Sequence, residues 1–282
     1  MSVVVNSNVP SIHASRSLAA NRLDLELAME RLSSGKRLNS SRDDAAGMSV
    51  VTRMTSQIQG LNMAVRNAND GISMANTYDA AAEEVGNVLT RMRELAVQMS
   101  NGSYATADRT NADKEFLALA NEIDRIATGT TFNGEAVADG TAGTSGVVTI
   151  QVDPKAVTTT ANIQLTFASL KGSELGMTAA YADKVDTAAN AQTAIGKIDT
   201  SLEKLNGNRA AVGSVVNRIE HTVAVLMNTV QRTEEARSRI QDTDYAAESA
   251  NLARANVLAQ AGTAMLAQSN QSPQYVLTLL RN

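Results

Sequence analysis

The residues of this sequence that could catalyse a reaction or bind a metal are few. The two histidines, His13 and His221, stand apart from other ligands, and there is no cysteine. Acid–base catalysis needs carboxylates that converge on one substrate, whereas neighbours in sequence point in different directions. The adjacent acidic pairs are Asp43/Asp44, Glu83/Glu84 and Glu234/Glu235. No glycine-rich phosphate-binding motif occurs. We therefore expect no enzyme, no cofactor and no metal site.

The composition favours helices packed on helices. Hydrophobic residues make up 43% of the 282 residues but aromatics only 3%, with three prolines, so the apolar side chains are mostly aliphatic. The net charge of −4 without a basic run argues against a nucleic acid or an anionic membrane as partner. No segment reaches the roughly 20 apolar residues of a membrane span. The start, MSVVVNSNVP, lacks the basic region of a secretory signal, so composition alone predicts a cytoplasmic protein.

Apolar residues in steps of three and four predict two long helices and a shorter one. The first stripe runs over residues 51–75, and Asp79 falls on its next position. Apolar residues resume over 85–99 in a shifted phase. This pattern predicts a stutter within one helix. A shorter helix is expected around residues 116–126. The last stripe covers residues 195–230 and is interrupted only by Arg209.

The middle of the chain has the pattern of strands. Apolar and polar residues alternate in TSGVVTIQVDP and TTANIQLTFASL, so we expect a small β-hairpin or meander over residues 147–170. Two strands are marginal alone and should pack on the helices. The predicted fold is mainly α, an elongated antiparallel helical bundle or coiled coil formed by the N- and C-terminal segments, with this β insertion in the middle.

The two ends of the chain are unusual helices. Residues 12–32 place Leu18, Leu25 and Leu32 seven apart, yet Leu23 and Leu27 fall on another face. The stretch SANLARANVLAQAGTAMLAQSNQSPQYVLTLL contains one charge and has apolar residues around most of its circumference. Such a helix is too polar for lipid and too apolar for a solvated surface. We expect it to be covered by other protein.

Five blocks of sequence resemble bacterial flagellins, in the same order as in that family. The first is RLSSGKRLNSSRDDAAGMSV, followed by TRMRELAVQMSNG, NEIDRIATGTTFNGE, NRAAVGSVVNRIEHTV and SRIQDTDYAAESANLARANVLAQAGTAMLAQSNQSPQYVLTLL. Only the region around residues 135–190 falls outside the resemblance. The resemblance implies a structural subunit that polymerises into the flagellar filament for swimming motility.

The resemblance also implies a division of the chain. The expected parts are an N-terminal inner-core helix and spoke (1–44), the N-terminal helices of a bundle domain (45–130), a solvent-facing loop and small β region (131–186), the long C-terminal helix of the bundle (187–240) and a C-terminal inner-core helix (241–282). Ordering a backbone residue costs about 1–2 kcal/mol. We therefore expect both ends to be disordered in the monomer and to order on assembly.

Particular residues are expected to carry these roles. For polymerisation they are Leu18, Leu25, Leu32, Ala255, Ala259, Gly262 and Leu266. In the spoke, Asp43 and Asp44 suit the positive end of a helix that starts near Ala45, with Ser41 or Asp43 as its cap.

The partners follow from the resemblance as well. They are other copies of the chain, possible paralogous flagellins in a mixed filament, an export chaperone, the filament cap and hook-associated proteins, with export through the flagellar type III apparatus to an extracellular filament. The vertebrate Toll-like receptor for flagellin is implied too, with Arg91, Leu95 and Glu115 at matching positions. An amphipathic helix with ordinary surface charges explains those three residues equally well.

Two other classes remain open from the sequence. A hook–filament junction protein would share the terminal helices, although the TTFNG and C-terminal blocks favour flagellin. A membrane-inserting translocator could use Ala-rich amphipathic ends, but the absence of Trp weighs against it.

Overall fold

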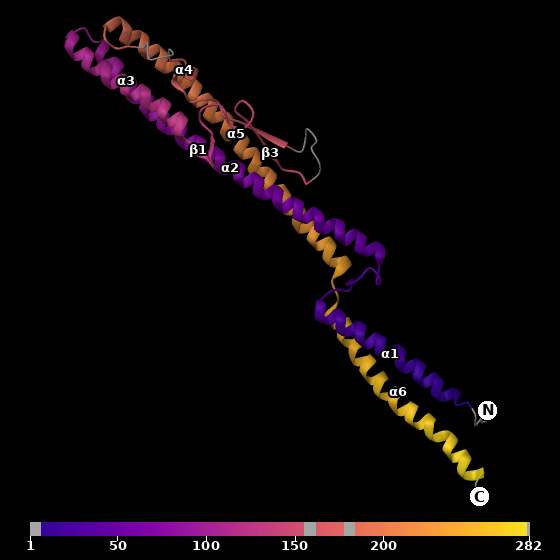
Figure 1. Ribbon diagram of the computed structural model, residues 1–282. Helices are drawn as coiled ribbons and strands as arrows, with labels where there is room; N and C mark the ends of the chain where they lie inside the picture. Colours follow the sequence, from indigo (N-terminus) through magenta and orange to yellow (C-terminus); the bar gives the residue numbers. More distant parts are fainter. Residues whose placement is uncertain (1–6, 155–161, 178–183, 281–282) are drawn as a thin grey trace. The chain divides into compact units, whose positions relative to one another are not determined.

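The computed structural model describes residues 7–154, 162–177 and 184–280. It confirms a mainly α fold with a small antiparallel β-hairpin (Figure 1). The elements are α1 (Val9–Ser34), α2 (Ala45–Ser100), α3 (Thr106–Gly129), β1 (Thr131–Phe132), β2 (Glu135–Ala136), β3 (Val147–Gln151), β4 (Asn162–Thr166), α4 (Gly172–Leu175), α5 (Ala188–Gln241) and α6 (Tyr245–Leu280). The chain divides into a terminal unit, Met1–Ser56 with Arg232–Asn282, and a central unit, Gln57–Gln231.

The central unit holds the hydrophobic core. In it α3 and α5 lie beside α2, and the strands lie over the same helices (Figure 1). The core is one cluster that runs from Leu61 on α2 to Leu226 on α5. Its largest fully buried side chains include Tyr78, Phe116 and Phe167, which come from α2, α3 and the segment after β4. This unit therefore has the apolar burial that an independently folding domain needs.

The buried stripe of α2 is continuous, so the predicted stutter is wrong. Tyr78 is fully buried between Ala75 and Ala82, and heptad steps continue from there to Met99 without a phase shift. Asp79 lies beside the stripe and not on it. The sequence pattern misled because small residues such as Ala64 and Gly71 hold inward positions that a count of large apolar residues overlooks.

The predicted β insertion is an antiparallel hairpin that packs on α2. Strands β3 and β4 pair with Ile150 opposite Ile163, and residues 155–161, inside the predicted β region, lie outside the described residues. A Cβ at Gly71 would overlap Cδ1 of Ile150, and one at Gly60 would come within 2.5 Å of Cβ of Pro154. Two glycines of α2 thus let the hairpin approach the helix closely.

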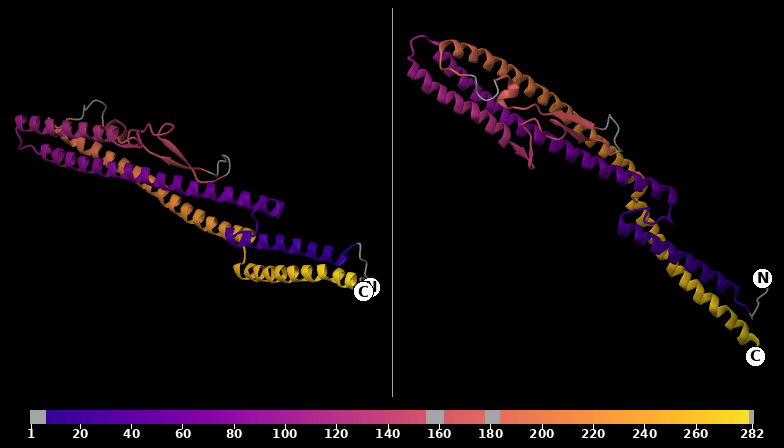
Figure 2. Two further views of the ribbon diagram at one scale, coloured as in Figure 1. Left: turned by 60° about the horizontal axis from the view of Figure 1, so that its bottom comes forward. Right: turned by 45° about the horizontal axis from the view of Figure 1, so that its top comes forward.

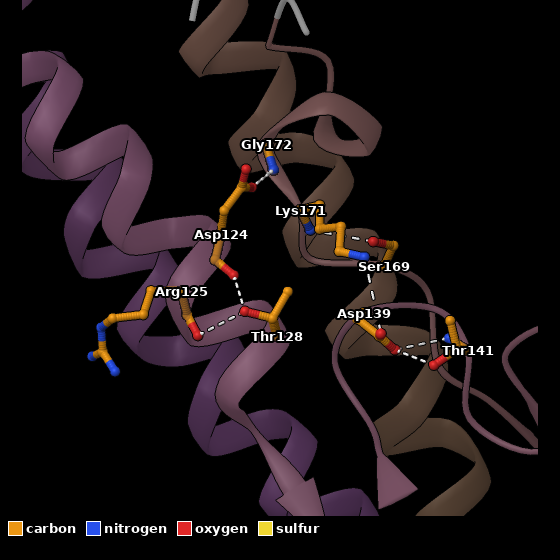
Figure 3. Close-up of polar contacts among 8 residues, drawn as sticks. All are labelled: Asp124, Arg125, Thr128, Asp139, Thr141, Ser169, Lys171 and Gly172. Carbon is orange, nitrogen blue, oxygen red and sulfur yellow. Dashed lines mark hydrogen bonds and ion pairs between the residues drawn. The ribbon is translucent and has the colours of Figure 1, made fainter. Parts of the chain in front are cut away.

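Polar contacts tie the end of the insertion to α3 (Figure 3). The backbone N–H of Gly172 donates to Oδ1 of Asp124 at 3.0 Å. Asp139 accepts from the hydroxyl of Thr141 at 2.6 Å and from its N–H at 2.9 Å, and its other oxygen lies 3.9 Å from Nζ of Lys171. These bonds, the Thr141 hydroxyl first, lower the pKa of the Asp139 carboxyl. Every one of these groups has a partner within the fold, so we read them as structural.

A candidate assembly surface on the paired terminal helices

Helices α1 and α6 form an antiparallel pair within the terminal unit, side by side in all views (Figures 1 and 2). On α1 the least exposed positions follow heptad steps, and so do those of α6. The α1 stripe is Ser11, Ala14, Leu18, Asn21, Leu25, Ala28 and Leu32. The α6 stripe is Glu248, Leu252, Ala255, Ala259, Gly262, Leu266 and Ser269. We call the contact between these two stripes the seam.

Large and small side chains alternate across the seam. A Cβ on Gly262 would lie 3.3 Å from Cδ1 of Leu18, so the leucine fills the space that the glycine leaves. Leu18 faces Gly262. When the antiparallel alignment is continued along both helices, Leu25 comes to lie opposite Ala255 and Ala28 opposite Leu252. Such complementary sizes allow close helix approach without voids.

Polar bonds fix the register of the pair at both ends. At the far end Nδ2 of Asn8 donates to the Ser269 carbonyl at 2.9 Å, and the Ser11 hydroxyl lies 2.8 Å from Oδ1 of Asn270. At the near end Lys36 and Asp242 form an antiparallel bridge, which continues the pairing into the connecting segments. Because these bonds need one alignment, they exclude neighbouring registers of the seam.

All seven residues predicted for polymerisation lie on the seam. Leu18 and Ala255 are buried there, and the other five, Leu25, Leu32, Ala259, Gly262 and Leu266, are half-buried. Their visible partners are therefore within the same chain. A role in assembly stays a prediction, and it would act through the shape of the α1–α6 pair.

The outward faces of α1 and α6 carry exposed apolar side chains that the sequence analysis did not single out as a site. Eight of the twelve large hydrophobic residues exposed in the described structure lie on these two helices. They are Val9, Ile12, Leu23, Met29, Tyr245, Val257, Leu258 and Met265. The sequence does indicate these outward residues. Leu23 lies on another face than Leu18, Leu25 and Leu32, and α6 is apolar around most of its circumference.

The spoke residues turn the chain between α1 and α2. Asp44 caps α2, because its Oδ1 accepts from the N–H groups of Ala46 and Gly47 at 3.0 and 2.9 Å. The predicted cap, Ser41 or Asp43, is therefore corrected. Asp43 instead accepts from the N–H groups of Ser40 and Asn39, which hold the pKa of its carboxyl below the usual value. Asp43 thus stabilises the turn before α2 and does not bond the N–H groups of the first turn of the helix.

The three residues matched to the receptor patch are only partly at the surface. Arg91 on α2 and Glu115 on α3 form an ion pair, with Nη2 2.9 Å from Oε1, and both side chains are about half exposed. That bond and one to Glu94 raise the pKa of Arg91. Leu95 is only 4% exposed and faces inward, so the structure removes it from an external contact surface.

Among the described residues no cluster of His, Asp and Glu could hold a metal ion. No described helix is long and apolar enough to cross a membrane. His13 is exposed on α1 and His221 is exposed on α5. The outward faces of α1 and α6, which carry most of the exposed large hydrophobic residues of the described structure, are the candidate functional surface.

Comparison with known proteins gives consistent matches along the chain. Residues 5–143 match the family model of the bacterial flagellin N-terminal helical region, and residues 195–280 match that of the bacterial flagellin C-terminal helical region. A flagellin of Halalkalibacterium halodurans is 41% identical over 279 residues, which cover 99% of this chain and 100% of the relative. The flagellar filament 31.3 kDa core protein of Treponema maltophilum is 37% identical over 289 residues, with the same coverage.

A solved structure has a similar fold. It is a provisionally named flagellar hook-associated protein from Vibrio parahaemolyticus, with a TM-score of 0.57 and 12% identity, covering 71% of this chain and 100% of that one. At this identity the likeness concerns the fold alone.

Proposed function

This chain belongs to the bacterial flagellin family and is a structural subunit of the flagellar filament, and from that premise we propose that its terminal unit provides the main contacts between neighbouring copies. In this proposal the central unit folds alone. The observation that carries it is the contrast between a central unit with a full core and a terminal unit with exposed apolar faces.

Burial supports the proposal. Every member of the core cluster lies in the central unit. In the terminal unit each helix of the pair buries only its seam stripe, and several of those positions are alanine, glycine or serine. Burial of apolar surface contributes about 25 cal/mol per Å², whereas ordering a residue costs about 1–2 kcal/mol. We infer from this that the α1–α6 pair needs further partners to become ordered.

The exposed apolar residues supply what such partners would cover. Contiguous apolar surface on a protein in solution marks an interaction site. A second copy that covers Leu23, Met29, Val257 and Met265 adds the burial that the seam lacks. We therefore infer that the terminal unit is disordered in the monomer and orders when the filament forms.

The flagellin relatives along the whole chain favour a filament subunit over a hook–filament junction protein. An export chaperone, the filament cap and hook-associated proteins remain proposed partners. A chaperone would cover the apolar faces of α6 before export, where an exposed apolar helix risks aggregation. Membership of the filament implies an extracellular location.

Receptor recognition is a separate proposal that rests on the exposed Arg91–Glu115 pair. A vertebrate Toll-like receptor would contact this pair on the outer faces of α2 and α3. A reporter assay tests it with Arg91→Ala, and Arg125→Ala, which removes a similarly exposed pair with Glu122, is the control. Equal responses of both variants and the unmodified chain would reject this proposal.

Hydrogen exchange of monomer and filament tests the assembly proposal. Amides of α1 and α6 should exchange freely in the monomer and become protected in the filament, whereas residues 57–99 should be protected in both. Protection of α1 and α6 equal to that of residues 57–99 in the monomer would contradict it.

A matched pair of variants tests which surface drives assembly. Val257 on α6 and Val225 on α5 are both helical valines that are 64% exposed. We expect Val257→Ser to raise the critical concentration for polymerisation, measured by sedimentation, and Val225→Ser to change it much less. The opposite ranking would place the main contacts in the central unit.

A further inference from the structure

A pocket opens on one flank of the α1–α6 pair and has charged walls. Its volume is about 210 Å³. From α1 it is lined by Asp24, Leu27 and Arg31, and from α6 by Arg254 and Leu258. Leu27 and Leu258 are apolar lining residues, and its charged lining residues are Asp24, Glu248, Arg31 and Arg254. This combination suits a side chain with an apolar stem and a charged head.

The two arginines of the pocket differ in what they can bind. Arg31 lies 3.9 Å from Glu248, and its Nε is buried without a partner among the described residues. Arg254 is exposed and makes no ion pair or hydrogen bond within the described chain. It is also the only charged residue between positions 249 and 280. The pocket therefore presents one exposed guanidinium group, that of Arg254, which could receive a carboxylate.

The complementary group lies on the other flank of the same helix. Of the acids on α1, Asp24 lines the pocket and Glu30 accepts from Asn39, whereas Glu26 is exposed with no partner in the described chain. Successive helical residues are about 100° apart. Asp24 and Glu26 thus lie on opposite flanks of the seam residue Leu25.

We propose that the pocket is an inter-subunit site in which Arg254 binds the Glu26 carboxylate of a second copy of this chain. The contact rests on the proposed function, because it needs copies that associate through their terminal units. Pocket and carboxylate occupy different surfaces, so the contact is heterologous and can repeat from copy to copy. An open chain of such contacts is what a filament requires, and opposite charges select the matching flank.

Charge exchange tests the pairing. We expect Arg254→Glu and Glu26→Arg each to raise the critical concentration for polymerisation at least about tenfold, since each sets like charges against one another. The double variant with both changes should recover most of the loss. Arg16→Glu, at an exposed arginine of α1 more than two turns from Glu26, is the control for net charge and should change assembly little. Circular dichroism of the monomers should be unchanged, because neither Arg254 nor Glu26 has a partner in the described chain.

The outcomes separate this inference from the proposed function. Normal assembly of Arg254→Glu, no recovery in the double variant, or an equal loss with Arg16→Glu would each overturn the pairing. If Val257→Ser prevents assembly while Arg254→Glu does not, the pairing fails and the role of the terminal unit stands. If neither variant affects assembly, the proposed function fails as well.

Discussion

Arg209 on α5 and Asp79 on α2 form a bidentate ion pair, with Nε 2.7 Å from Oδ1 and Nη2 3.1 Å from Oδ2. In the sequence these two residues break the spacing of large apolar residues, although in the structure Asp79 lies beside the buried stripe of α2. The pair lies at the edge of the core, where both side chains are partly exposed. It joins the two long helices of the central unit at one level and so helps to fix their alignment.

Removing the Arg209–Asp79 ion pair should lower the free energy of unfolding only slightly. The interaction between the two side chains should still be measurable as a coupling energy. Because both side chains are more than a third exposed and screened by solvent, we expect a coupling energy of about 0.5–1 kcal/mol. A double-mutant cycle with Asp79→Asn and Arg209→Gln, followed by urea unfolding of the central unit, measures it. Additive single changes would show that the two side chains do not stabilise the fold through each other.

Tyr78 should make stability depend on alkaline pH. Its ring is fully buried beside Phe167, and its hydroxyl donates to the Ala168 carbonyl at 3.0 Å. Burial first, and the nearby Asp79 second, raise the pKa of this phenol above its ordinary value of 10.0. The folded state therefore holds the proton more tightly than the unfolded state, so its contribution is complete below pH 10 and declines as the pH rises further.

The Tyr78 prediction has a direct measurement. Urea unfolding between pH 8 and 11 should show a falling free energy of unfolding that Tyr78→Phe makes shallower. At pH 7 the same variant should be destabilised by about 1 kcal/mol, because the part-buried Ala168 carbonyl loses its donor. Tyr104→Phe, at a less buried tyrosine, is the control for the loss of a phenol hydroxyl.

Gly71→Ala should loosen the β-hairpin from α2. The added methyl group would overlap Cδ1 of Ile150. Overpacking costs about 1–3 kcal/mol, against a helix-propensity gain of up to about 1 kcal/mol. We therefore expect a net loss of about 1 kcal/mol in thermal or urea unfolding, and Ile150→Val, which removes Cδ1, should reduce that loss. Gly196→Ala, on α5 where nothing lies within 4 Å, should instead be neutral or stabilising.

Gly262→Leu should prevent assembly by forcing α1 and α6 apart. Leu18 already occupies the space above Gly262, so a larger side chain cannot be accommodated in the observed register. Leu266→Asp should act similarly by placing a charge on the seam. Electron microscopy should show no filaments, while unfolding of the central unit keeps its midpoint. Gly213→Leu, on an open face of α5, controls for the loss of a helical glycine.

Asp44→Ala should destabilise the start of α2 more than Asp43→Ala. Asp44 bonds two N–H groups of the first turn, and loss of such a cap costs about 0.5–2 kcal/mol. Hydrogen exchange of residues 45–48 should accelerate in Asp44→Ala. If Asp43→Ala accelerates it more, the capping role belongs to Asp43 after all.

The sequence predicts the class of fold well because periodicity reports burial directly. The stripes over residues 51–99 and 195–230 correspond to α2 and α5, and alternation over residues 147–170 corresponds to β3 and β4. The predicted stutter at Asp79 was wrong because Ala64, Gly71 and Tyr78 hold inward positions on α2 that the pattern of large aliphatic residues did not count. The partner of Asp79 comes from a helix 130 residues later, which no local pattern contains.

The candidate site was only half visible in the sequence. Heptad spacing of Leu18, Leu25 and Leu32 identifies the inward face of α1, but a stripe alone does not say whether its partner is the same chain or another. The structure pairs that stripe with α6. The outward residues, Leu23 and Val257 among them, follow only once the inward face has been assigned.

The pairing of α1 with α6 has a consequence for the order in which the chain can mature. Helix α1 has its seam partner in α6, so during synthesis α1 lacks that partner until α2, α3, the strands and α5 have all been made. Closing so long a loop is also entropically unfavourable. The α1–α6 pair is therefore a late step of folding, which can form only after the elements of the central unit are available.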